Sequence, residues 1–111
     1  MTLGQEFHGW GFTINDEIEN LRAAQEHLKI VNLGATAIGT TVTAAPGYPE
    51  LAVKNLAELT GIDFKNSEDL IAATSDCGAY MTLSSAIKGL AVKMTKVCND
   101  IRLLASGPRC G

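Results

Sequence analysis

"YMTLSSAIKGLAVKMTKVCNDIRLL", residues 80–104, carries the most regular apolar pattern in the chain. Large apolar side chains recur there at alternating steps of three and four residues, which is the spacing of one face of an α-helix. Just beyond it, Gly107 and Pro108 stand where a helix usually ends. The spacing therefore predicts one long amphipathic helix over about residues 75–106. Its apolar stripe consists of Tyr80, Leu83, Ile87, Leu90, Met94, Val97, Ile101 and Leu104.

Small residues accompany this stripe at intervals of seven. A small side chain next to a row of large apolar side chains lets a second helix approach closely. Three lysines, at positions 88, 93 and 96, are predicted to lie on a solvated face of the same helix. The small residues are Cys77, Ser84, Ala91, Cys98 and Ala105.

A second long helical pattern precedes this one and predicts a helix over about residues 3–33. Thr2 and Gln5 match a capping box at its start, and Gly34 stands where a left-handed glycine would end it. Glu17 occupies a stripe position, either as the partner of a buried cation or facing a wet groove, and the sequence does not decide between these. The apolar positions are Phe7, Trp10, Ile14, Leu21, Ala24, Leu28 and Val31.

The segment between the two long patterns predicts an irregular stretch at 35–48 and a short helix at 49–60. Pro49 suits the first turn of that helix and Gly61 its end. Ser67, which precedes two acidic residues, has the features of a helix N-cap. No alternating pattern indicates a β-strand. The predicted fold is all-α, a piece of a long-helix bundle with a short helix between two long ones.

The two long helices require more apolar partners than the chain itself supplies. A helix of 30 residues is about 45 Å long, whereas a compact domain of 100 residues has a radius of gyration of about 13 Å. The apolar stripes are therefore expected to pack against other copies of the chain or against segments outside it.

Composition excludes several classes of protein. The chain has 111 residues, 46% of them hydrophobic and 19% charged, and a net charge of −3. This charge gives no reason to expect binding to nucleic acid or to an anionic membrane. No apolar run is long enough to span a membrane, and the first residues lack the pattern of a signal peptide. We therefore expect a cytoplasmic protein.

Cysteine and histidine residues give no sign of a metal site. The three cysteines, Cys77, Cys98 and Cys110, form no CxxC pair, and neither histidine has a ligand partner at suitable spacing. We expect reduced thiols and no metal ion.

Several motifs together resemble the aspartase/fumarase superfamily, and most closely its aspartate ammonia-lyases. They are "LGQEF" (3–7), "NLGATAIGT" (32–40), "EDLIAATSDCGAY" (68–80) and "LAVKMTKVCNDIRLLASGPR" (90–109). The resemblance implies a three-domain subunit whose central domain is a bundle of long helices, four subunits joining their bundles in one core. Residues 1–111 then correspond to part of that central domain and contain no complete catalytic domain.

The same resemblance implies an enzymatic activity, and it implies that the catalytic residues lie outside this chain. The reaction is the reversible elimination of ammonia from L-aspartate to give fumarate, with no metal or organic cofactor. The family's T-H-x-Q-D motif is expected upstream and its S-S-x-M-P-x-K-x-N loop downstream, so no catalytic residue is expected within residues 1–111. The expected partners are further copies of the chain, as a homotetramer, and a small dicarboxylate substrate. A fragment of a fumarate hydratase and a non-catalytic helical scaffold remain as alternatives.

The loop that contains Gly39 is the candidate site nearest to substrate. Thr36, Gly39 and Thr40 lie either beside the carboxylate-binding pocket or in a buried elbow between helices, and the elbow is favoured. The family usually has a further glycine after this loop's "GT", where this chain has Thr41-Val42-Thr43. A β-branched residue does not easily take the positive φ that glycine allows. Either the backbone does not need that φ here, or the loop is bent differently.

A polar group near the end of the long helix is the second candidate. Asn99, Asp100 and Arg102 lie within one helical turn. We expect them to hydrogen-bond across helices and to fix the register of the bundle, rather than to bind a ligand.

Overall fold

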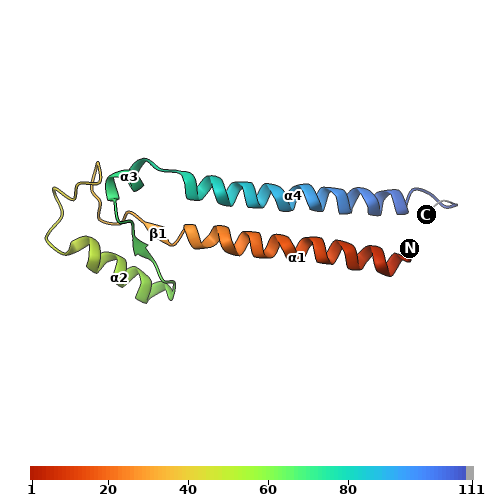
Figure 1. Ribbon diagram of the computed structural model, residues 1–111, viewed down its shortest axis with the longest axis horizontal. Helices are drawn as coiled ribbons and strands as arrows, with labels where there is room; N and C mark the ends of the chain where they lie inside the picture. Colours follow the sequence, from red (N-terminus) through yellow and green to blue (C-terminus); the bar gives the residue numbers. More distant parts are fainter. Residues whose placement is uncertain (110–111) are drawn as a thin grey trace. The chain divides into compact units, whose positions relative to one another are not determined.

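The computed structural model describes residues 1–109 and is mostly helical, as the sequence predicts (Figure 1). Its contacts divide the chain into two units. The first combines Met1–Ala23 with Thr82–Gly111, and the second is Ala24–Met81. The two long helices, α1 (Leu3–His27) and α4 (Gly78–Leu104), each belong mainly to the first unit.

The first unit is an antiparallel pair of helices (Figure 1). The predicted capping box begins α1, because the backbone N–H of Thr2 donates to Oε1 of Gln5 at 2.8 Å and that of Gln5 to Oγ1 of Thr2 at 3.2 Å. Trp10 is the most deeply buried aromatic residue, with 7% of its surface exposed. The Phe7 ring meets it edge-on, with 4.9 Å between ring centroids.

The apolar stripe of α4 divides into two rows in the first unit. Leu83, Leu90 and Val97 are half-buried. The other row stays exposed, Ile87 by 51%, Met94 by 40% and Ile101 by 46%. Because seven residues make almost two complete helical turns, each row keeps its own side of the helix. The first row packs in the pair of helices, and the second row keeps about half of its surface uncovered by residues 1–109.

The second unit contains a feature that the helical patterns do not predict, a short parallel strand pair. β1 (Ile30–Val31) pairs with β2 (Lys65–Asn66), Ile30 opposite Lys65. The backbone N–H of Lys65 donates to the carbonyl of Lys29 at 2.9 Å, and that of Ser67 to the carbonyl of Val31 at 2.9 Å. The prediction that the first helix reaches residue 33 is therefore wrong, since residues 30–31 use their backbone groups in this pairing.

Two further boundaries differ from the prediction. The long C-terminal helix begins at Gly78 rather than at residue 75, and a separate short helix, α3 (Leu70–Ser75), precedes it. Asp69 rather than Ser67 caps α3, because its Oδ1 accepts the backbone N–H groups of Ile71 and Ala72 at 2.9 and 3.0 Å. Asp76 has an extended backbone, so α3 and α4 are not continuous.

The short central helix agrees with the prediction to within one residue. α2 (Tyr48–Thr60) has Pro49 in its first turn, and Gly61 ends it with a φ of 70°. No helix among residues 1–109 is both long enough and apolar enough to cross a membrane.

Candidate functional site

The loop of residues 35–41 is a closed turn within the second unit. Its ends are joined by the backbone N–H of Thr41, which donates to the carbonyl of Ala35 at 3.0 Å. Gly39 is buried in it with a φ of +85°, and a Cβ at this position would lie 2.5 Å from the Cα of Ile71 and from the carbonyl oxygen of Leu70. The glycine therefore lets the loop lie directly against the start of α3.

The candidate threonines of this loop have different surroundings. Thr36 is half-buried and has a φ of 64°, whereas Thr40 is exposed. Neither hydroxyl makes a hydrogen bond within the described part of the chain. Both can therefore donate to a group outside it. Whether this group is a substrate carboxylate stays a prediction for Thr36, Gly39 and Thr40.

Thr41 has the positive φ that the resemblance left in doubt. Its φ is 57°, so a β-branched residue adopts the left-handed conformation at the position where the family resemblance implies a glycine. This conformation costs a side-chain-bearing residue roughly 1–2 kcal/mol. The alternative that the backbone does not need a positive φ at this position is therefore wrong, and Thr41 bears its steric cost.

Replacing Thr41 with glycine is expected to stabilise the full-length protein by about 1 kcal/mol, because the steric cost at positive φ exceeds the entropy that glycine adds to the unfolded chain. Chemical denaturation at one fixed protein concentration measures the change. As the matched control, Thr43→Gly should destabilise, since Thr43 has no positive φ. Equal effects of the two substitutions would contradict the interpretation.

Asn66 is a structural residue that the sequence interpretation missed. Its side-chain amide accepts the backbone N–H of Leu33 at 3.0 Å and donates to the carbonyls of Leu33 and Pro49 at 3.1 and 3.2 Å. One side chain thus joins β2 to the loop and to the start of α2. No local pattern marks Asn66, because its three bonds reach residues 17 and 33 positions away in the sequence.

A cleft of about 620 Å³ lies beside this loop in the second unit. Thr41, Pro49, Val53 and Leu70 are among the residues that line it, with the carboxylates of Glu50 and Glu68 also on its wall. Neither carboxylate forms an ion pair within residues 1–109. Two negative charges disfavour a dicarboxylate, so the cleft alone does not provide the binding site that such a substrate needs.

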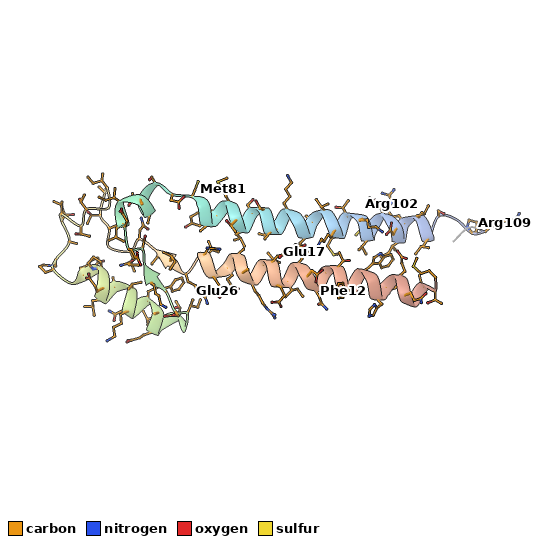
Figure 2. The ribbon with its side chains drawn as sticks, in the orientation of Figure 1. Phe12, Glu17, Glu26, Met81, Arg102 and Arg109 are labelled. Atoms are coloured by element: carbon orange, nitrogen blue, oxygen red, sulfur yellow. The ribbon has the colours of Figure 1, made fainter. Side chains whose placement is uncertain are left out.

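The first unit contains a buried ion pair between α1 and α4. Glu17, of which 5% is exposed, binds the ammonium group of Lys93. Figure 2 shows Glu17 between the two helices. The side-chain amide of Asn20 donates a further hydrogen bond to Glu17 at 3.3 Å. Of the two interpretations left open for Glu17, the structure shows the buried pair, and the prediction that Lys93 is simply solvated is wrong.

The hydrogen bond from Lys93 holds the pKa of Glu17 below its ordinary value of 4.5, although burial acts in the opposite direction. As the pH falls, the Glu17 carboxylate is therefore protonated in the unfolded chain before it is protonated in the folded chain. The stabilisation by Glu17 should be complete above pH 4.5 and be lost at lower pH.

We expect Glu17→Gln to flatten the pH dependence of the thermal unfolding midpoint in this acid range. Glu19→Gln, which alters an exposed pair with Arg22, should leave it unchanged, and an equal effect of both variants would argue against the assignment.

The predicted polar group at the end of α4 is not joined into one network by the described residues. Asp100 binds Lys96 of the same helix, and this hydrogen bond raises the pKa of Lys96. Asn99 and Arg102 are exposed. The role of Asn99, Asp100 and Arg102 in bundle register stays a prediction.

Among residues 1–109, no three His, Cys, Asp or Glu side chains lie close enough together to bind a metal ion. Cys77 and Cys98 are free thiols, and Cys110 lies outside the described residues. The expected absence of a cofactor stays a prediction for the full-length protein.

Known proteins match the chain over its entire length. The sequence model of a protein family described as "Lyase" matches residues 1–111. The chain belongs to this lyase family. The motif-based resemblance to the aspartase/fumarase superfamily is thus confirmed.

Relatives within the lyase family include two aspartate ammonia-lyases. The protein from Escherichia coli (strain K12) is 56% identical over 111 residues, and that from Pseudomonas aeruginosa is 54% identical over 112 residues, each alignment covering all of this chain. A solved structure described as a fumarate lyase:delta crystallin from Brucella melitensis, bound to cobalt, matches all of this chain with a TM-score of 0.95 and 41% identity. The chain spans 23% and 24% of the lengths of the two relatives and 24% of the solved chain.

Proposed function

We propose that this chain is part of the central helical domain of an aspartate ammonia-lyase, which converts L-aspartate to fumarate and ammonia. The observation that carries the proposal is the 56% identity to the Escherichia coli aspartate ammonia-lyase along the whole chain. In this reaction a base removes a proton from Cβ of the substrate, and hydrogen-bond donors stabilise the charge that develops on the carboxylate. The base is expected in the family's serine loop, outside residues 1–111.

The contribution of this chain to the enzyme is to hold subunits together in a helical core. The exposed row of Ile87, Met94 and Ile101 supports this role, since these side chains keep 40–51% of their surface accessible in the single chain. Small residues beside this row, such as Ala91 and Cys98, leave room for a second helix. We propose a homotetramer assembled through α4 and located in the cytoplasm.

The loop of residues 35–41 is proposed to support the substrate pocket formed in the assembled enzyme. Gly39 lets the loop pack on α3, and the hydroxyls of Thr36 and Thr40 make no hydrogen bond within the described residues. Substrate carboxylates are acceptors, so these two hydroxyls are suitable donors toward the pocket.

The activity is tested with the full-length protein that contains this chain. Purified protein mixed with L-aspartate should form fumarate, followed by its ultraviolet absorbance, together with one ammonia per fumarate. Residues 1–111 alone should form none, because the catalytic motifs lie outside them. Hydration of fumarate to malate without any reaction on aspartate would identify a fumarate hydratase instead. The absence of both reactions would favour a non-catalytic scaffold.

A further inference from the structure

Apolar contacts do not fix how far α1 and α4 are shifted along each other. The large side chains of α4 repeat every seven residues, as Leu83, Leu90 and Val97 illustrate. A shift of one helix by seven residues, about 10 Å, therefore brings similar apolar groups into contact again. Residues 28–77 separate the two helices, so no tight turn between them imposes the alignment. Something other than the apolar stripe must specify the register.

Glu17 is the one charged side chain that is buried among residues 1–109, with 5% of its surface exposed. Lys93 supplies the cation, and Asn20 adds a hydrogen bond at 3.3 Å. Gly89 provides space, because a Cβ at this position would lie 3.1 Å from Oε2 of Glu17. The carboxylate thus faces a residue without a side chain and a lysine one turn further along α4.

The shifted alignments lack this combination. A shift of seven residues in one direction places Glu17 opposite Lys96 and Asp100, whose side chains already bind each other. Glu17 would then meet a second carboxylate, which is unfavourable. A shift in the other direction places it opposite Thr82 and Ala86, which bring no positive charge. In the first alignment the Glu17 carboxylate would have to share Lys96 with Asp100, and in the second it would be buried without any cation, which is costly.

We propose that the Glu17–Lys93 pair, together with the space that Gly89 leaves for the Glu17 carboxylate, sets the register of α1 against α4. A buried ion pair adds little net stability compared with apolar side chains, because both charges lose their hydration. Its effect is to exclude the shifted alignments. This role is independent of the catalytic activity, since it concerns only the packing of two helices in the first unit.

The test compares register and stability in the full-length protein. Spin labels replace the exposed residues His8 and Lys88, in a background without native cysteines and diluted with unlabelled protein. In the parent, the distance between the labels should have one maximum. Glu17→Met combined with Lys93→Met should unfold at the same or a higher temperature, yet show a second distance about 10 Å longer or shorter, corresponding to seven residues.

Two further variants make the outcome decisive. The exchanged pair, Glu17→Lys with Lys93→Glu, should restore the single distance. The control Glu19→Met with Arg22→Met, which removes an exposed pair of the same helix, should keep it. A single, parental distance in the Glu17/Lys93 methionine variant would overturn the proposal. Failure of this variant to fold while the exchanged pair folds would also overturn it, because the pair would then supply stability rather than register.

Discussion

Replacing Ile87 and Met94 with aspartate is expected to separate the proposed homotetramer of the full-length protein into folded monomers. Both side chains lie on the exposed row of α4, with 51% and 40% of their surface accessible. Burial of a complete side chain of this kind contributes roughly 1.5–3 kcal/mol, and an aspartate in its place must be dehydrated without a partner. The dissociation constant should rise at least a hundredfold, as about 1.4 kcal/mol corresponds to a factor of ten. Sedimentation at tens of micromolar protein measures the change.

Two variants of the same helix separate assembly from folding. Lys88→Asp with Thr95→Asp introduces the same residues at exposed positions next to the row, and it should leave the oligomer intact. Leu90→Asp with Val97→Asp changes the half-buried row, so it should reduce helix content and not only oligomer size. An intact oligomer for the Ile87/Met94 variant would show that another surface of the protein forms the interface.

The long helices were predictable because their information is local and repeated. The stripe of α4 needs only the spacing of three and four residues, and the ends of α2 need only Pro49 and Gly61. Each signal lies within a few residues of the structure that it specifies. Periodicity also indicated that the apolar faces exceed what one chain can cover, and the exposed row of α4 agrees with this.

The errors concern contacts between distant residues. Leu28 and Val31 continue the apolar spacing of α1, yet the chain leaves the helix after His27 and pairs residues 30–31 with residues 65–66. Asn66 then connects three segments through its side chain. A pairing across more than thirty positions has no signature in the sequence around either strand, so helical spacing alone extended the first helix too far.

The polar residues of the first unit show the same limit. The stripe position of Glu17 revealed that a charge would face the partner helix, but not which cation would meet it. Choosing Lys93 requires the alignment of α1 on α4, which only the folded pair of helices supplies. Similarly, the sequence did not determine whether Thr41 has a positive φ, and in the structure its φ is positive.

Gly39→Ala is expected to be among the most destabilising single substitutions in the second unit. The added Cβ would lie 2.5 Å from the Cα of Ile71 and from the carbonyl oxygen of Leu70, and the residue would also have to keep a φ of +85°. Positive φ costs roughly 1–2 kcal/mol, and overpacking against the backbone adds about 1–3 kcal/mol. The free energy of unfolding should therefore fall by about 2–5 kcal/mol. Hydrogen exchange of residues 35–41 and 69–75 in the full-length protein would show where the loss occurs.

Gly47→Ala separates the two causes of that loss. Gly47 has a similar φ of +77°, but a Cβ there would meet nothing within 4 Å. This variant should lose only the conformational part, about 1–2 kcal/mol, and keep the protection of residues 69–75 against exchange. If both alanine variants lost the same stability, the contact of Gly39 with α3 would contribute nothing. A larger loss at Gly39, with faster exchange in α3, would instead show that the loop and α3 hold each other in place through this one glycine.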